Sequence, residues 1–194
     1  ILGLDILLWG SCFIEQKPGN KHPWHIDLEY KSWDGITIWV GLKNLNNNTP
    51  LSIITHSHEI DNFPQALKDK NIDINNDEDV LVEAKKINPK CEIKTFYMNS
   101  GEFIIWSGKV WHKTNNLSSK NRESIILQYC STNNQVKIPL NYDHKNMKWS
   151  EDKPACILIS GEDNKKLNKI LEKSSLKFEE GFIYEFFKIL TKKN

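Results

Sequence analysis

Arginine is almost absent from this chain of 194 residues. Of its 26 basic residues, 25 are lysine and only Arg122 is arginine. Lysine replaces arginine wherever a positive charge is enough, but not where a planar guanidinium must bind a carboxylate through two hydrogen bonds. Arg122 is therefore a candidate anion-binding residue, with a surface arginine of no special function as the alternative.

An excess of either charge is also missing. The 26 basic and 25 acidic residues leave a net charge of +1, which excludes a general polyanion-binding surface and predicts no nucleic-acid partner. With 39% hydrophobic and 10% aromatic residues, the chain can bury a core, and we expect a single domain over residues 1–194.

Paired cysteines, membrane-spanning runs and a signal peptide are lacking as well. No apolar run approaches the roughly 20 residues of a membrane span, and no basic-then-apolar leader opens the chain. Without a CxxC pair, a zinc ribbon or a disulfide framework is disfavoured, and we expect a reducing, cytoplasmic location. The first residue is Ile rather than Met, so one interpretation is that this chain is a fragment that lacks the N-terminal part of its domain. The separated cysteines are Cys12, Cys91, Cys130 and Cys156.

Short segments rich in β-branched and aromatic residues make up most of the first 130 positions. Polar turns between neighbouring segments predict hairpins, one joining residues 36–42 to 51–55 and another joining 91–98 to 102–106. Many short strands with such turns predict an all-β jelly roll, whose mouth is a usual place for a cofactor.

Two regions depart from this strand pattern. Residues 57–90 are polar and acidic, with a short helix expected from Asn76 or Asp77 to about Lys86. We interpret them as an insertion or lid, or equally as a solvated loop. Residues 145–194 form a C-terminal extension with a strand at 156–161 and a helix from 163 to about 173. Apolar residues at helical spacing, Phe182, Phe186 and Leu190, predict a last helix, docked on the barrel or, alternatively, at a dimer contact or membrane surface.

His25 and Asp27 form the first candidate site. Two residues apart on an extended strand, their side chains point to one face. An imidazole and a carboxylate need one more ligand to complete the facial triad of non-haem Fe(II) enzymes, which leaves positions open for oxygen chemistry.

His112 is the predicted third ligand, because it stands between two strands and precedes Arg122 by ten residues. Iron on these three ligands could bind a 2-oxo acid whose distal carboxylate Arg122 grips. His56 and His58 form a competing pair, but no carboxylate or third histidine stands at an obvious offset from them. A polar loop leaving a strand explains that pair better.

Together these segments resemble the phytanoyl-CoA dioxygenase branch of the Fe(II)/2-oxoglutarate-dependent oxygenases. The resemblance covers about residues 3–130 and implies a double-stranded β-helix with a few flanking helices. It rests on a His-Pro-x-His-x-Asp segment, a Trp-containing strand, a Gly-acidic-apolar run into the distal histidine, and an Asn-to-Arg passage. In this chain they are His22–Asp27, Ile38–Leu42, Gly101–His112 and Asn116–Arg122.

The resemblance also implies cofactors and contacts. Fe(II) would be held by His25, Asp27 and His112, with 2-oxoglutarate as co-substrate and O2 as oxidant. The C5 carboxylate of 2-oxoglutarate would bind Arg122. Further expected pocket residues are Thr114, Trp39, Cys12 and, with a weaker basis in an Arg-x-Ser pairing, Ser124; core packing is the alternative for Trp39 and Cys12.

The implied reaction is hydroxylation of a small-molecule or acyl substrate, with 2-oxoglutarate converted to succinate and CO2. Asp27 favours this outcome because related halogenases carry a small residue there. Two departures stand out: Thr55–His58 replaces the usual Pro-Gly-Ser-His, and we expect the family's N-terminal region to be absent from this sequence.

Two other functions stay open at this point: a cupin-like metal enzyme without 2-oxoglutarate, using His56 and His58, and a catalytically silent jelly-roll binding module. The substrate is also open among acyl-CoA, amino acid, alkaloid-like and saccharide classes. Aromatic residues near the ligand segments could line its pocket or pack in the core: Trp24, Trp33, Trp106 and Trp111. Nothing in the sequence indicates an oligomeric state.

Overall fold

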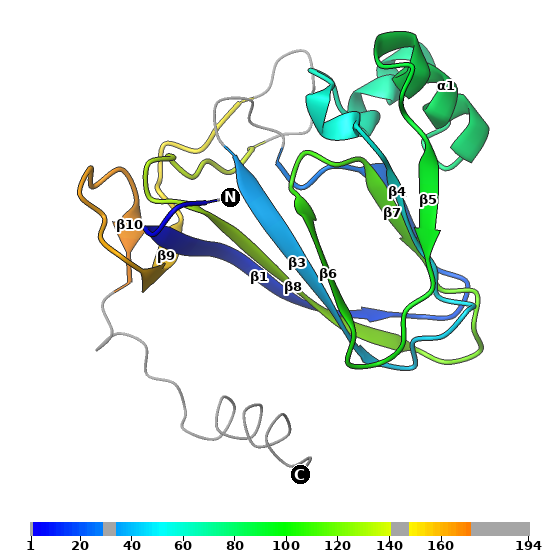
Figure 1. Ribbon diagram of the computed structural model, residues 1–194, viewed down its shortest axis with the longest axis horizontal. Helices are drawn as coiled ribbons and strands as arrows, with labels where there is room; N and C mark the ends of the chain where they lie inside the picture. The colour runs from blue at the N-terminus through cyan, green and yellow to red at the C-terminus, as the bar shows by residue number, and fades with distance from the viewer. Residues whose placement is uncertain (1, 29–33, 141–147, 172–194) are drawn as a thin grey trace.

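Two β-sheets face each other in the computed structural model, which describes residues 2–28, 34–140 and 148–171 (Figure 1). The six-stranded sheet has the order β10-β9-β1-β8-β3-β6, and the four-stranded sheet has the order β2-β7-β4-β5. The larger sheet contains β1 (Ile6–Gln16), β3 (Gly35–Lys43), β6 (Phe103–Ser107), β8 (Arg122–Ser131), β9 (Ala155–Ser160) and β10 (Lys169–Ile170). The smaller contains β2 (Lys21–His25), β4 (Leu51–Ile54), β5 (Ile93–Phe96) and β7 (His112–Asn115).

Among the first eight strands the chain changes sheet at every step except from β4 to β5, which pair in the smaller sheet, and this gives the orders 1-8-3-6 and 2-7-4-5. This strand order is the jelly-roll arrangement, and it confirms the predicted double-stranded β-helix. The two predicted hairpins are wrong, however. β3 pairs with β6 and β8, and β4 pairs with β5 and β7, because the polar turns carry the chain across to the opposite sheet.

The space between the sheets is filled by side chains that alternate along each strand. In β3, Thr37 and Trp39 are buried while the residues between and beside them are partly exposed, as the period of two requires. The central cluster contains Trp39, Leu45, Leu51, Met98, Trp106 and Val110. The inward-facing residues of β3 are therefore placed beside the interior of the barrel.

Residues 57–90 fold into η1 (Ser57–Glu59), η2 (Pro64–Lys70) and α1 (Asp77–Ile87). The helix confirms the prediction: Asn76 caps it by accepting hydrogen bonds from the backbone N–H groups of Glu78 and Asp79. Its apolar side packs in a cluster with Trp24 and Trp111, both fully buried; truncating either tryptophan to alanine would cost about 3–5 kcal/mol. The segment is thus a packed layer rather than a solvated loop, and a lid function stays a prediction.

The C-terminal part differs from the sequence prediction. Residues 163–171 contain a turn and β10, which pairs in parallel with β9, so the helix expected there is wrong. Ile170 packs against the cluster that contains Cys156, and this tertiary contact overrides a weak local helix preference. The helix expected around Phe182 lies outside the described residues. Within the described residues, no helix is long and apolar enough to cross a membrane.

Candidate metal centre

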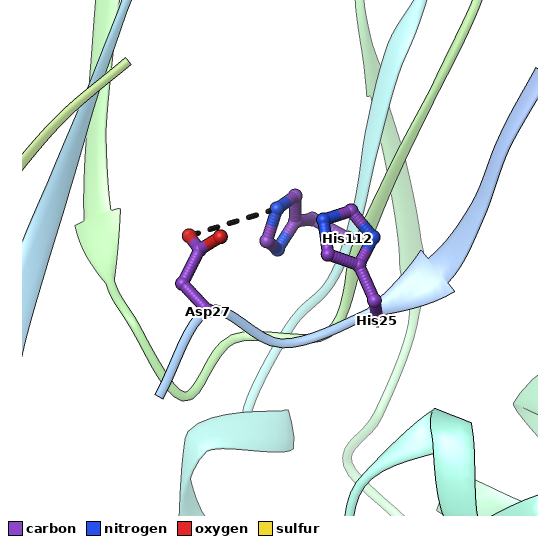
Figure 2. A group of neighbouring side chains, drawn as sticks. All are labelled: His25, Asp27 and His112. Atoms are coloured by element: carbon purple, nitrogen blue, oxygen red, sulfur yellow. Dashed lines mark ion pairs between the residues drawn. The ribbon is translucent and has the colours of Figure 1, made fainter. Parts of the chain in front are cut away.

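The side chains of His25, Asp27 and His112 converge inside the barrel (Figure 2). Their ligand atoms all lie within 4.8 Å of one another. His25 ends β2, His112 begins β7, and the two are directly paired across these antiparallel strands, with ring centroids 4.1 Å apart. The structure therefore brings together the three residues that the sequence predicted as ligands.

A β-bulge in β2 turns His25 toward the interior. His22 pairs with Thr114 and His25 pairs with His112, so β2 has one residue more than β7 over this stretch. Pro23 lies within the bulge, where its missing N–H costs no ladder hydrogen bond. The bulge also stacks the His22 ring on the His25 ring at 4.0 Å, although the two residues are three apart.

Asp27 lies beyond the end of β2, so the expectation that both ligands share one strand is wrong. Its backbone N–H donates to the carbonyl of Gly108 at 2.9 Å, as does that of Leu28 at 3.0 Å. A Cβ at Gly108 would lie 2.5 Å from Cγ of Leu28. Glycine is required for this close approach, which fixes the backbone that carries the carboxylate.

Hydrogen bonds set the tautomer of both imidazoles. Nδ1 of His25 lies 2.8 Å from the carbonyl oxygen of Pro23, and Nδ1 of His112 lies 2.9 Å from that of Val110. A carbonyl oxygen only accepts, so each Nδ1 carries a proton, and Nε2 is the ring nitrogen left for a metal ion. Burial, together with nearby His112 and His22, holds the pKa of His25 well below its usual value. His25 is therefore a neutral imidazole, the form that binds metals.

The carboxylate of Asp27 is held by two donors from neighbouring strands. The Thr37 hydroxyl donates to Oδ2 at 2.6 Å, and the Trp106 indole N–H donates to the same oxygen at 3.4 Å. Nε2 of His112 lies 3.7 Å from that oxygen. Two imidazoles with Nδ1 engaged by carbonyl oxygens and an oriented carboxylate suit a non-haem Fe(II) ion.

Gln65, from η2, fixes the residue between the two ligands on the chain. Its side-chain oxygen accepts from the backbone N–H of Ile26 at 3.3 Å, and its side-chain nitrogen donates to the Ile26 carbonyl at 3.2 Å. Sequence reasoning missed Gln65 and Thr37. Thr37 could have been found as an inward-facing polar residue of β3, whereas nothing in the sequence marks a side chain that acts on a distant backbone.

Arg122, the first residue of β8, is buried beside the centre with only 1% of its surface exposed. Its Nε and Nη1 atoms have no hydrogen-bond partner among the described residues, and the guanidinium carbon lies 5.1 Å from the Trp39 ring centroid. Burial lowers the pKa of Arg122 to about 10, so the residue is still a cation at neutral pH. A buried cation with unused donors is costly unless an anion pairs with it.

A cavity of about 210 Å³ joins Arg122 to the two histidines. Thr114 and Trp39 also line it, as the resemblance implied. Cys12 does not: it is exposed on β1 and is absent from the lining. Ser124 is fully buried on the same face of β8 as Arg122, and its hydroxyl has no partner among the described residues. An anionic ligand that reaches both Arg122 and the metal ligands fits this cavity.

The competing histidine pair lies elsewhere. His56 precedes η1 and His58 lies within it, and both pair with Glu59, at 3.3 Å and 3.9 Å. Neither belongs to the group formed by His25, Asp27 and His112. The arrangement gives no support to a metal site built on that pair.

Known proteins resemble the chain in sequence pattern and fold. The family model described as phytanoyl-CoA dioxygenase (PhyH) matches residues 4–124. The apo structure of the non-heme monooxygenase ThoJ is 13% identical with a TM-score of 0.55, over 98% of this chain and 66% of that chain. EctD from S. alaskensis with 2-oxoglutarate and 5-hydroxyectoine is 21% identical with a TM-score of 0.50, over 70% of this chain and 48% of that one.

A third structure, the non-heme alpha ketoglutarate dependent epimerase SnoN, is 12% identical with a TM-score of 0.50. It matches 67% of this chain and 49% of its own length. The chain therefore spans less than two thirds of the length of these structures, and at such identities they show a shared fold. No curated protein sequence matches the chain.

Proposed function

The chain belongs to the phytanoyl-CoA dioxygenase family, and on this basis we propose that it is an Fe(II)- and 2-oxoglutarate-dependent dioxygenase. The proposed reaction hydroxylates a small-molecule or acyl substrate while 2-oxoglutarate and O2 become succinate and CO2. One oxygen atom enters the new hydroxyl group and the other enters succinate. The observation that carries this proposal is the buried Arg122, whose unused donors face the cavity shared with His25 and His112.

The metal would be held by Nε2 of both histidines and by the carboxylate of Asp27. Such a triad occupies one face of the ion and leaves positions open for other ligands. Bound Fe(II) supplies the redox chemistry that couples decarboxylation of 2-oxoglutarate to hydroxylation. Thr37 and Trp106 hold the carboxylate in place through Oδ2. The presence of Asp27 favours hydroxylation over halogenation.

The co-substrate would lie in the cavity of about 210 Å³. Arg122 binds the C5 carboxylate in this proposal, because a guanidinium matches a carboxylate with two parallel hydrogen bonds. Thr114, buried on β7 two residues after His112, offers its hydroxyl to the same group. Trp39 packs along the guanidinium and limits its orientations. These contacts fix the orientation in which the 2-oxo acid meets the metal.

Formation of succinate from 2-oxoglutarate tests the reaction, even where it is uncoupled from the substrate. We expect succinate to form with Fe(II) and O2, and to be lost without Fe(II) or in His112→Ala. His56→Ala serves as the matched control, because His56 pairs with Glu59 at the surface. Succinate formation that is the same in His112→Ala as in the wild type, or its absence from the iron-loaded wild type, would contradict the proposal.

A further inference from the structure

A second and larger cavity, of about 500 Å³, lies on the other side of the candidate ligands. His22 and His25 line both cavities, Asp27 lines only the larger one, and Arg122 and His112 line only the smaller one. The three ligands therefore stand between a cavity suited to the 2-oxo acid and another that can hold a further molecule. A drug-sized or metabolite-sized ligand occupies a volume of this order.

One wall of the larger cavity is shaped by a β-bulge in β1. Leu8 pairs with Tyr129 and Gly10 pairs with Gln128, so Trp9 is the extra residue of the bulge. Bulges redirect a side chain out of the regular alternation, and Trp9 lines the cavity together with Gln128. A Cβ at position 10 would lie 2.5 Å from Oε1 of Gln128. Gly10 thus leaves the room in which the Gln128 side chain lies.

A second wall comes from the chain after β8. Ser150 donates its backbone N–H to the Ile138 carbonyl at 2.9 Å, and Leu140 donates to the Lys148 carbonyl at 2.8 Å. Pro139 and Trp149 form an antiparallel bridge between them. From these two bridged segments the cavity is lined by Lys137, Ile138, Pro139 and Trp149. All four lie beyond residues 4–124, so the family model does not cover this wall.

In the described part of the lining, lysines outnumber carboxylates. Lys68, from η2, and Lys137, from the segment that contains Pro139, are on two different walls. Among the described residues that line the cavity, Asp27 is the only acidic one, and its carboxylate points toward the other metal ligands (Figure 2). The remaining surface is mainly apolar or aromatic, including Trp9 and Trp149. Such a lining favours a molecule with an apolar body and a negative charge.

We propose that the larger cavity binds the primary substrate, and that this substrate is an amphipathic anion: an apolar, ring-bearing body with a carboxylate or phosphate group. The body packs against Trp9 and Trp149, and the anion binds the ammonium groups of Lys68 and Lys137. This orientation places a C–H bond of the body on the Asp27 side of the metal centre. Calling the bound molecule the substrate rests on the proposed function; the binding itself does not.

Three matched probes test the proposal: 2-naphthylacetate, 2-naphthyl phosphate and the neutral 2-naphthylacetamide. Each is titrated calorimetrically into Mn(II)-loaded protein saturated with 2-oxoglutarate and kept free of oxygen. We expect at least one anion to bind about tenfold more tightly than the amide, since hydrogen bonds between charged groups in a partly buried site are worth that much. The tighter of the two anions identifies the charged group as carboxylate or phosphate.

The double variant Lys68→Gln/Lys137→Gln should remove this preference while leaving the affinity for the amide within about twofold. The matched control, Lys148→Gln/Lys153→Gln, removes the same net charge from residues outside the lining and should keep the preference. Trp149→Phe should weaken the anions and the amide alike. Unchanged affinity for 2-oxoglutarate and an unchanged melting temperature show that each variant is folded.

Three results would overturn the inference: equal affinity for anions and amide, an anion preference that survives the double lysine variant, or displacement of the anions by 2-oxoglutarate. If 2-oxoglutarate binding depends on Arg122 but the affinity for the anionic probes does not depend on Lys68 and Lys137, only this inference fails. If the affinity for the anionic probes depends on the two lysines but 2-oxoglutarate does not bind, the cavity assignment stands and the proposed function fails.

Discussion

His25 and His112 face each other across β2 and β7, and each imidazole is held by the carbonyl two residues before it, that of Pro23 or of Val110. One strand pairing therefore sets the spacing of two ligands, and one repeated local hydrogen bond sets both tautomers. The result is a pair of Nε2 atoms available to one ion. This is a property of the backbone as much as of the two side chains.

Loss of either histidine should abolish tight metal binding. We expect His25→Ala and His112→Ala to lower the affinity for Co(II), used as a spectroscopic stand-in for Fe(II), by more than about 100-fold, because removing a ligand costs more than the 10–100-fold typical of its supporting partners. Visible absorption of Co(II) measures the effect. His58→Ala is the control, since His58 lies outside the ligand group; an equal loss in this control would contradict the assignment.

Thr37→Val should weaken metal binding without disrupting the fold. Valine has nearly the shape of threonine but cannot donate to Oδ2 of Asp27, so the carboxylate loses its shorter hydrogen bond. We expect about a tenfold lower affinity for Co(II). Thr95→Val is the matched control, because the Thr95 hydroxyl bonds Ser52 on the smaller sheet instead. Equal affinity in Thr37→Val and wild type would show that Thr37 does not position Asp27.

Gln65→Leu should act on the metal centre from outside it. The variant removes both hydrogen bonds to the Ile26 backbone, so the segment between His25 and Asp27 is held less firmly. We expect faster amide hydrogen exchange at Ile26 and Asp27 and a weaker affinity for Co(II). Gln135→Leu, at an exposed position, is the comparison. Unchanged amide exchange at Ile26 in Gln65→Leu would contradict the role of Gln65 in holding the backbone between His25 and Asp27.

Two buried thiols predict a loss of stability at high pH. Burial raises the pKa of Cys130 to about 12 and that of Cys156 to about 11, from an ordinary 9.0. Above pH 9 the unfolded chain loses these protons while the folded protein keeps them, so the free energy of unfolding falls as pH rises. The slope approaches about 1.4 kcal/mol per pH unit for each thiol.

Urea unfolding at pH 8, 9 and 10 measures that slope. The variant Cys130→Ala/Cys156→Ala is less stable at every pH because it leaves small cavities, but its stability should fall less steeply above pH 9. Cys12→Ala, at an exposed position, should keep the slope of the wild type. Equal slopes in the wild type and the double variant would contradict the raised pKa values.

The sequence predicted the grouping of the candidate ligands better than it predicted the strand pairing. His25, Asp27 and His112 could be picked out as a group because metal chemistry restricts residue types and because the lone arginine follows His112. The hairpins were wrong because a polar turn such as residues 44–50 shows where a strand ends but not which sheet the chain enters next. Pairing in this fold depends on contacts between distant segments, such as β1 with β8.

The parts of the site that escaped prediction act through the backbone or through irregular structure. The bulges that redirect His25 and Trp9 appear only once strands are paired in register. The wall that carries Lys137 and Trp149 has no strand periodicity in its sequence, since it is a short bridge between loop segments. Local pattern therefore identified the chemistry, whereas tertiary structure determined the shape of the second cavity.

Binding of 2-oxoglutarate to Arg122→Lys tests the central claim most directly. Calorimetric titration into Mn(II)-loaded protein without oxygen should give an affinity about 10–100-fold below that of the wild type, because lysine cannot form the paired hydrogen bonds to the C5 carboxylate. Lys120→Arg, two residues away at an exposed position, should bind 2-oxoglutarate as the wild type does. Equal affinity in Arg122→Lys and wild type would contradict the role of Arg122 and, with it, the proposed 2-oxoglutarate site.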